Sequence, residues 1–102
     1  MGDVALLAID QGTSSSRAIA FSLRGEILAL EQQPFEQIYP ASGWVEHDPE
    51  VIWATVLSTV RAVLRRLGER RIAVAGVGLT NQRETTVVWN RRTGVPLHNA
   101  IV

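Results

Sequence analysis

The first apolar run of the chain covers residues 4–9 and ends at an acidic residue, Asp10. Six apolar residues without interruption are typical of a strand that is buried on both faces of a sheet. Residues 17–23 alternate large apolar side chains with small ones, which predicts a second strand, antiparallel to the first. Residues 24–25 predict a turn and residues 26–33 a third strand. We therefore expect the chain to begin with a three-stranded meander.

The pattern breaks up between Pro34 and Asp48, where proline and glycine predict a connecting loop. Three of the six aromatic residues lie in that loop, so we expect it to pack against the rest of the domain. Asp48 and Pro49 are typical of an N-cap and the first position of a helix. Gly68 is typical of a helix stop. The core-facing positions expected from the helical spacing are Ile52, Val56, Val60, Val63 or Leu64, and Leu67.

A second apolar run, residues 72–79, predicts a buried strand parallel to the first. Its glycines, Gly76 and Gly78, lie inside the strand and do not fit a dinucleotide-binding turn, so we expect them to allow close packing of a helix. Six polar residues follow at 80–85, at the end of that strand. The pattern then predicts a short strand at 87–89, a turn at 91–94 and a return arm from Val95. This order predicts an α/β fold with a mixed sheet: the ribonuclease H-like half-domain from which actin-like ATPases are built.

Composition narrows the class of protein. The 102 residues can form one small domain, and the 46% of apolar residues is too high for a disordered segment. Ten acidic residues balance ten basic ones, all arginine, so a classical P-loop, which needs lysine, is excluded. The absence of cysteine excludes disulfides and thiolate metal sites. We find no signal peptide and no run long enough to span a membrane, so we expect a cytoplasmic protein that binds no membrane.

The arginines between residues 61 and 71 allow two interpretations. They could form a patch that binds nucleic acid, or they could be the solvated end of a helix. The zero net charge favours the helix end, so we expect no nucleic-acid partner.

The chain ends on an apolar run, residues 100–102, with no helix cap and no charged tail. We therefore expect residues 1–102 to be a truncated piece of a longer protein.

Residues 10–17 place an acid, a glycine, four hydroxyl residues and an arginine directly after the first strand. Glycine lets the backbone approach a ligand closely, and successive turn amides with hydroxyl donors can hold an anion. Arg17 can bond phosphate, and Asp10 can hold the accompanying magnesium. The alternative is a hairpin whose turn is rich in small polar residues. We call residues 11–16 the phosphate turn.

The motif Asp10-Gln11-Gly12-Thr13 is similar to the first phosphate motif of the actin-like ATPases. Further motifs, in order and at the expected spacing, closely resemble the FGGY carbohydrate kinases, and among them the members that phosphorylate glycerol. These motifs are residues 35–40 (FEQIYP), 43–49 (GWVEHDP), 52–55 (IWAT), 80–86 (TNQRETT), Thr93-Gly94, Pro96 and 99–102 (NAIV). The resemblance extends from Leu7 to Val102. Other FGGY kinases are not expected to carry the segment 81–86, which we call the acceptor turn.

The resemblance implies ATP-dependent phosphorylation of glycerol to sn-glycerol 3-phosphate, with Mg²⁺, in a cleft between two ribonuclease H-like domains. It implies that Asp10 helps to hold the metal through water and that Arg17 and Thr13 lie near the transferring phosphate, so Asp10 and Arg17 are the candidate catalytic residues. The candidate nucleotide ligands are Thr13, Ser14, Ser15 and Arg17, and the candidate glycerol ligands are Arg83 and Glu84.

The chemistry of the acceptor turn agrees with this assignment. Arg83 only donates hydrogen bonds and Glu84 only accepts them, so together they can orient a diol. The alternative is an ordinary surface ion pair, which contributes little.

In the resembling family the catalytic aspartate lies beyond the point where this chain ends. The 102 residues are therefore expected to be the N-terminal part of the N-terminal domain, inactive alone, and the full-length protein to be a homo-oligomer. Three alternatives remain: an actin-like nucleotide-binding protein without a small-molecule acceptor, another FGGY sugar kinase, and a stand-alone packing domain.

The histidines and tryptophans are expected to have structural roles. His47 and His98, without cysteine or a suitably spaced acid, predict no metal site, and we expect His47 to support the loop before the helix. Trp44, Trp53 and Trp89 are expected to pack in the core or the loop.

Overall fold

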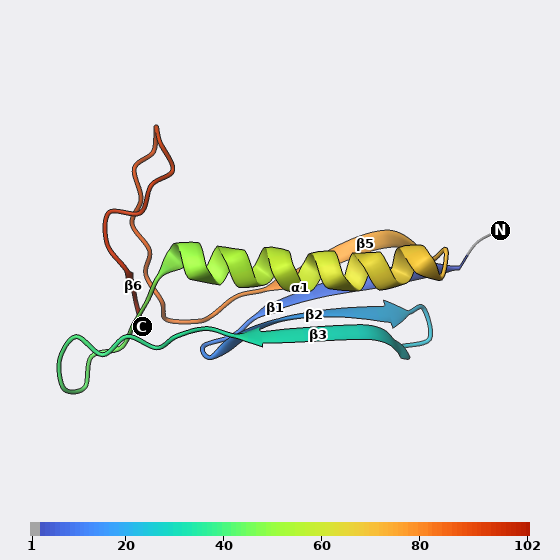
Figure 1. Ribbon diagram of the computed structural model, residues 1–102, viewed down its shortest axis with the longest axis horizontal. Helices are drawn as coiled ribbons and strands as arrows, with labels where there is room; N and C mark the ends of the chain where they lie inside the picture. The colour runs from blue at the N-terminus through green and yellow to red at the C-terminus, as the bar shows by residue number, and fades with distance from the viewer. Residues whose placement is uncertain (1–2) are drawn as a thin grey trace.

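A four-stranded mixed sheet, with one long helix along one face, makes up the body of the protein (Figure 1). The computed structural model describes residues 3–102. Its elements in chain order are β1 (Val4–Gln11), β2 (Ser15–Ser22), β3 (Ile27–Pro34), β4 (Glu46–His47), α1 (Pro49–Glu69), β5 (Ala73–Thr80) and β6 (Ala100–Ile101). The predicted α/β fold, with a meander, one main helix and a following parallel strand, is confirmed.

The strand order β3-β2-β1-β5 brings the ends of two distant segments together. β1 pairs antiparallel with β2, so that Asp10 lies opposite Arg17, and parallel with β5, so that Asp10 also lies opposite Thr80. Because parallel strands end at the same edge of a sheet, the turn after β1 and the segment after β5 emerge side by side. This is the end of the molecule at which α1 begins (Figure 1).

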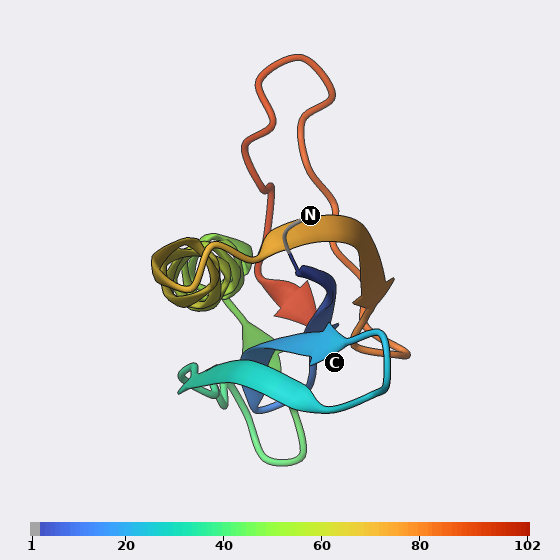
Figure 2. The ribbon, with the colours of Figure 1, turned by 90° about the vertical axis from the view of Figure 1, so that its right-hand side faces the viewer.

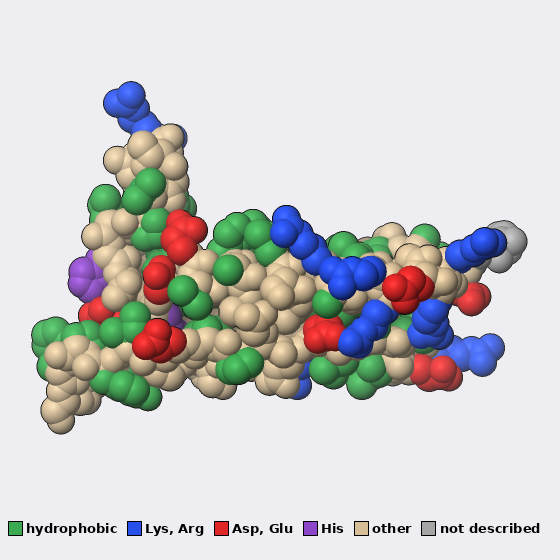
Figure 3. Space-filling model, viewed as in Figure 1, with side chains coloured by type: hydrophobic (Ala, Val, Ile, Leu, Met, Phe, Trp, Pro, Cys, Tyr) green, Lys and Arg blue, Asp and Glu red, His purple; other side chains and the backbone are tan. Residues whose placement is uncertain are grey.

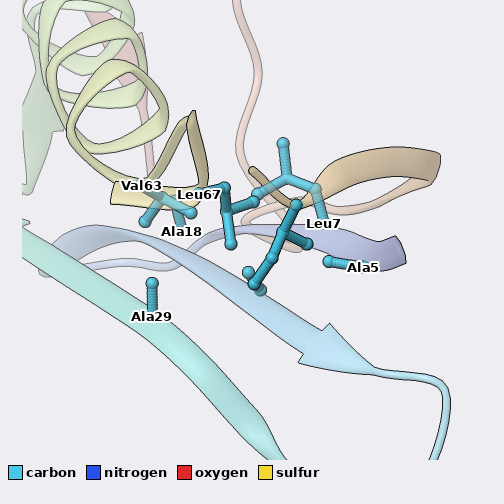
Figure 4. Close-up of a cluster of buried hydrophobic side chains, with 8 residues drawn as sticks. Ala5, Leu7, Ala18, Ala29, Val63 and Leu67 are labelled. Atoms are coloured by element: carbon cyan, nitrogen blue, oxygen red, sulfur yellow. The ribbon is translucent and has the colours of Figure 1, made fainter. Parts of the chain in front are cut away.

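The core lies between α1 and the covered face of the sheet (Figure 4). The sheet contributes four alanines and Leu7, the helix contributes Val63 and Leu67, and Ile72 follows from the segment before β5, so the small side chains of the strands let the helix lie close to them. The buried cluster consists of Ala5, Leu7, Ala18, Ala20, Ala29, Val63, Leu67 and Ile72. Seen end-on, the helix lies beside the curved sheet (Figure 2).

Helix α1 begins as the sequence predicts. Asp48 is the N-cap, its side chain accepts a hydrogen bond from the Glu50 N–H at 2.9 Å, and Pro49 follows at the first position. The predicted stop at Gly68 is wrong, since the helix continues to Glu69. The residue in the left-handed conformation after it is Arg71, with φ of 56°.

The predicted core-facing stripe of the helix is only partly right. The fully buried positions are Thr55, Thr59, Val63 and Leu67. Two are threonines, which hydropathy counts as polar. Their hydroxyls are satisfied internally: Thr59 Oγ1 donates to the Thr55 carbonyl at 2.9 Å, and Thr55 Oγ1 donates to Ser16 Oγ at 2.7 Å.

The prediction that both apolar strands are buried on two faces is wrong within residues 3–102. In β1, Leu6 is 44% exposed, because α1 covers only the opposite face. In β5, an edge strand, Val77 and Leu79 are exposed. The strand glycines do not serve helix packing either: a Cβ at Gly78 would meet nothing within 4 Å.

The loop between β3 and α1 packs only at its ends. Phe35 is buried and meets the ring of His47 edge-on, with centroids 4.9 Å apart. Tyr39 and Trp44 are exposed, so the prediction that this loop packs against the rest of the domain holds for Phe35 and is wrong for the other two aromatic residues. Trp53 and Trp89 are also more than half exposed, and the packing role predicted for the three tryptophans is not seen in residues 3–102.

Residues after β5 form the predicted hairpin, but residues 87–89 are not a regular strand. Isolated bridges join Thr86 to Ile101 and Trp89 to Pro96. The hairpin projects from the body (Figure 1), which helps to explain an elongated molecule of 53 × 31 × 20 Å. Its radius of gyration is 15.8 Å, against about 13 Å for a spherical domain of this size.

Two of the arginines between residues 61 and 71, Arg66 and Arg70, contact strand β3. Arg66 pairs with Glu31 and donates to the Leu30 carbonyl, and Arg70 donates to the Leu28 carbonyl at 3.0 Å. These contacts occupy carbonyls of β3, an edge strand. Acidic and basic side chains alternate at this end of the surface (Figure 3). Within the part of the chain that is described, no helix is long and apolar enough to cross a membrane.

Candidate functional site

The phosphate turn and the acceptor turn meet at the carboxyl ends of β1 and β5. Gln11, the last residue of β1, donates from Nε2 to the Oε1 atom of Gln82 at 3.1 Å, although the two residues are 71 positions apart. Ligands of open α/β sheets gather beyond the carboxyl ends of the strands. The two segments selected from the sequence thus lie together where this rule expects a site.

A tight backbone turn follows Gln11. The Gly12 N–H donates to the Ser15 carbonyl at 3.0 Å, and a Cβ at Gly12 would lie only 3.3 Å from that oxygen. The Gly12 N–H is therefore not free to bind an anion, so the expectation that successive amides of this turn hold an anion is wrong for Gly12. The N–H groups of Thr13 and Ser14 donate to no acceptor within residues 3–102, and both residues are exposed. These two amides remain available to a ligand.

The four hydroxyl residues of the phosphate turn have different surroundings. Thr13 and Ser14 are exposed. Ser15 Oγ accepts a bond from Gln32 Nε2 at 2.7 Å and stays partly exposed. Ser16 is fully buried against Thr55 of the helix, so the expectation that all four hydroxyls face a ligand is wrong for Ser16.

Asp10 and Arg17 form an ion pair at 2.8 Å between the Asp10 Oδ2 and Arg17 Nη2 atoms. Both side chains are partly exposed, at 34% and 42%. The pair follows from the register, which places the two residues opposite each other on β1 and β2. The sequence analysis assigned Asp10 to a metal and Arg17 to a phosphate, and it did not predict this direct contact.

The carboxylate of Asp10 fits magnesium in the form that accompanies a nucleotide. Residues 3–102 hold no group of three or more His, Cys, Asp or Glu that could form a metal cage. Mg²⁺ does not require one, because it usually takes one or two carboxylates, substrate phosphate oxygens and several waters. A single partly exposed carboxylate beside the phosphate turn matches that donor set.

In the acceptor turn, Arg83 and Glu84 are both exposed. No ion pair joins them in the described chain, so the surface ion pair considered as an alternative is not formed. Glu84 has φ of 54°, a left-handed conformation that is uncommon for residues other than glycine. Such conformations occur often at ligand sites, where the surrounding structure maintains them.

Two residues outside both turns, His47 and Gln37, which the sequence did not single out for the site, link Gln82 of the acceptor turn to Thr13 of the phosphate turn. Gln82 Nε2 donates to His47 Nδ1 at 2.9 Å, and His47 Nε2 contacts Gln37 Oε1 at 2.6 Å. Gln37 Nε2 in turn donates to the Thr13 carbonyl at 3.1 Å. With the Gln11–Gln82 bond, these contacts form a circuit that starts and finishes on the phosphate turn. The sequence prediction placed His47 only in support of the loop before the helix.

The contacts fix the state of His47. Because Gln82 donates to Nδ1, that nitrogen must be unprotonated, and the proton must lie on Nε2, which donates to Gln37. His47 is fully buried, and burial lowers its pKa below the usual 6.5. The structure therefore holds a neutral imidazole in one tautomer.

An open pocket of about 360 Å³ lies beside this circuit. Residues from both turns and from helix α1 line it, including Gln11, Trp53, Asn81, Gln82 and Thr85. Arg83 and Glu84 are not among the lining residues.

Comparison with known proteins gives consistent matches. Residues 5–102 match the FGGY family of carbohydrate kinases, N-terminal domain. Glycerol kinase of Albidiferax ferrireducens is 60% identical over 97 residues, and glycerol kinase of Burkholderia pseudomallei is 53% identical over 102. These matches cover 95% and 100% of this chain and 20% of each relative, so the chain spans about one fifth of their length.

Solved structures agree with the sequence comparisons. A crystal structure of Plasmodium falciparum glycerol kinase with ADP superposes with a TM-score of 0.91 at 34% identity, covering 99% of this chain and 20% of that protein. Xylulose kinase from Rhodospirillum rubrum superposes with a TM-score of 0.88 at 26% identity, covering 95% of this chain and 20% of that protein.

Proposed function

Because the chain belongs to the FGGY family of carbohydrate kinases, we propose that it is the N-terminal part of an ATP-dependent kinase that phosphorylates glycerol to sn-glycerol 3-phosphate. The observation that carries the proposal is the direct contact of the phosphate turn with the acceptor turn through Gln11 and Gln82. A phosphoryl group can pass between two substrates only if their sites adjoin.

In this proposal the phosphate turn holds the nucleotide. The free N–H groups and hydroxyls of Thr13 and Ser14, together with the Ser15 hydroxyl, donate to phosphate oxygens. Arg17 exchanges its contact with Asp10 for a phosphate oxygen, where a guanidinium makes charge-assisted bonds. Asp10 holds the Mg²⁺, which neutralises phosphate charge when bound. Phosphoryl transfer depends mainly on such positioning and electrostatic stabilisation.

The acceptor turn holds glycerol in this proposal. Arg83 donates to one hydroxyl oxygen and Glu84 accepts from a neighbouring hydroxyl. Their adjacent positions orient the diol, so that the remaining hydroxyl is directed toward the nucleotide. The general base that takes its proton comes from outside these 102 residues, which are therefore inactive alone. The full-length kinase of this proposal is a cytoplasmic homo-oligomer.

Product analysis of the full-length kinase that carries this chain tests the proposal. With ATP, Mg²⁺ and glycerol, we expect ³¹P NMR to show glycerol phosphate and ADP in equal amounts, and an enantiospecific sn-glycerol 3-phosphate dehydrogenase to oxidise that product. Xylulose and gluconate serve as competing acceptors that test for another FGGY kinase. If the folded full-length protein phosphorylates xylulose or gluconate and leaves glycerol unchanged, the phosphorylated compound replaces glycerol as the proposed acceptor.

A further inference from the structure

We infer that His47 is a positioning residue that sets the phosphate turn and the acceptor turn relative to each other, through the hydrogen-bonded circuit Gln11–Gln82–His47–Gln37–Thr13. The inference rests on the proposed function for the ligand that each turn holds. It adds a role for a side chain that touches neither ligand.

The donors of the circuit all run in one direction. Gln11 donates to Gln82, Gln82 donates to Nδ1 of His47, and Nε2 of His47 donates to Gln37. Gln37 then donates to the Thr13 carbonyl. Each amide uses its oxygen toward one neighbour and its nitrogen toward the next. Turning any one of these side-chain amides by 180° would place two donors or two acceptors against each other. The hydrogen bonds of the circuit therefore run in a single direction.

The surroundings of His47 hold it in place. It is fully buried, and Gln82 is 6% exposed. The Phe35 ring meets the imidazole edge-on, and the backbone of His47 pairs with Ala100 in the two-stranded sheet of β4 and β6. A buried polar group with all of its partners is well fixed, whereas one that loses a partner is destabilised. The position of either turn is therefore tied to this ring.

The circuit has two arms that finish on functional groups. The Nε2 arm passes through Gln37 to Thr13, whose N–H is available to the nucleotide. The Nδ1 arm passes to Gln82, and Arg83 is the next residue in the chain. A change at His47 is thus transmitted through Nε2 to Thr13, and through Nδ1 to Gln82, which precedes Arg83 in the chain and also accepts the bond from Gln11.

Two substitutions separate the arms. His47→Asn keeps an acceptor near the Nδ1 position but has no donor at Nε2, so it releases Gln37 and the phosphate turn. His47→Gln can place a donor near Nε2 but loses the Nδ1 acceptor, so it releases Gln82 and the acceptor turn. Gln37→Leu removes the Nε2 arm without changing the histidine, and it replaces a side chain that is only partly buried.

The test measures the dissociation constant for ADP and the KM for glycerol in the full-length kinase that carries this chain. We expect His47→Asn and Gln37→Leu to weaken ADP binding about tenfold, equivalent to about 1.4 kcal/mol, with a much smaller change in the KM for glycerol. We expect His47→Gln to raise the KM for glycerol about tenfold, with a much smaller change in ADP binding. In the wild-type protein, ¹⁵N NMR should show that the His47 imidazole is neutral and carries its proton on Nε2.

Thr59→Val is the matched control, because Thr59 is also buried and its hydroxyl hydrogen-bonds only to carbonyls of its own helix. It should lower the melting temperature and leave both constants unchanged. Equal changes in both constants for the two His47 variants, or a fall in melting temperature alone, would overturn the positioning role. If a His47 variant does not fold, Gln37→Leu decides alone, since unchanged ADP affinity contradicts the circuit. Failure of the proposed function gives a different result, because the wild-type kinase then leaves glycerol unphosphorylated. In that case the ADP titrations still test the arm of the circuit that leads to Thr13.

Discussion

Asp10 and Arg17 bring opposite charges together at the start of the phosphate turn. A partly exposed ion pair of this kind contributes at most about 1 kcal/mol to stability, so stability alone is a weak reason for its position. In the proposed kinase both residues exchange this contact for ligands, Arg17 for phosphate and Asp10 for Mg²⁺. The pair keeps both side chains close to those positions before the ligands arrive.

Asp10→Asn in the full-length kinase tests this interpretation. The change removes a negative charge and keeps the shape of the side chain. We expect kcat to fall about a hundredfold, a size common for the loss of one preorganised electrostatic contact. The KM for glycerol should stay near its original value. Near-normal kcat at saturating Mg²⁺ and ATP would make Asp10 a structural residue.

Arg83→Ala and Glu84→Ala test the acceptor turn. Losing a hydrogen bond to a charged group costs about 1.5–3 kcal/mol, so each change should lower kcat/KM for glycerol roughly tenfold to over a hundredfold. ADP affinity, measured by titration, should change little, because neither side chain belongs to the phosphate turn. Loss of ADP binding with an unchanged KM for glycerol would remove both residues from the acceptor site.

The lowered pKa of His47 predicts how stability depends on pH. Because burial depresses the pKa in the folded chain, the unfolded chain binds this proton more readily. The stabilisation from a neutral His47 is complete above pH 6.5 and is lost as pH falls through the lower folded pKa. Urea unfolding between pH 7.5 and 5 should therefore show a declining free energy of unfolding.

His47→Asn should flatten the curve over the same range. A free energy of unfolding that stays constant down to pH 5 in the original chain would contradict a buried neutral imidazole.

At the scale of elements, helix α1 shows which features the sequence could predict. Its start was predicted correctly, because Asp48 and Pro49 act within the first turn itself. Its end was not, because Gly68 remains helical and Arg71 takes the left-handed conformation beyond it. The buried threonines were missed because their hydroxyls have partners that hydropathy does not reveal: Thr55 meets Ser16 of β2, and Thr59 donates to carbonyls of its own helix.

Gly68→Ala tests the corrected helix end. Gly68 is helical, and an added Cβ would meet nothing within 4 Å. Alanine should therefore stabilise the chain by about 0.5–1 kcal/mol, as in a helix interior. Urea unfolding with an unchanged m-value measures this. Gly25→Ala is the contrasting variant: Gly25 has φ of 85°, and its substitution should destabilise. A loss of stability in Gly68→Ala would restore Gly68 as the helix stop.

The site could be predicted only where its residues follow one another in the chain. The phosphate turn and the acceptor turn are short contiguous segments, and their residue types indicate their chemistry directly. The circuit through Gln37, His47 and Gln82 joins side chains from separate loops. Glutamine is too common in surface loops to indicate burial, and a lone histidine indicates no partner, so only the folded arrangement reveals this connection.

At the scale of the whole molecule, one face of the sheet and the β5 edge stay open in the part of the chain that is described. Leu6, Val77 and Leu79 are exposed there. Continuous apolar strands are typical of sheets covered on both faces. The chain spans about one fifth of its glycerol kinase relatives, so this open face accords with the proposal that residues 1–102 are part of a larger domain.

The central claim is that the two turns form a single site for nucleotide and acceptor. A crystal structure of the full-length kinase that carries this chain, with ADP, Mg²⁺ and glycerol, tests it most directly. We expect phosphate oxygens within about 3 Å of the N–H groups of Thr13 and Ser14, and glycerol oxygens at a similar distance from Arg83 and Glu84. Glycerol bound away from the acceptor turn, or phosphates bound away from residues 11–16, would contradict the account.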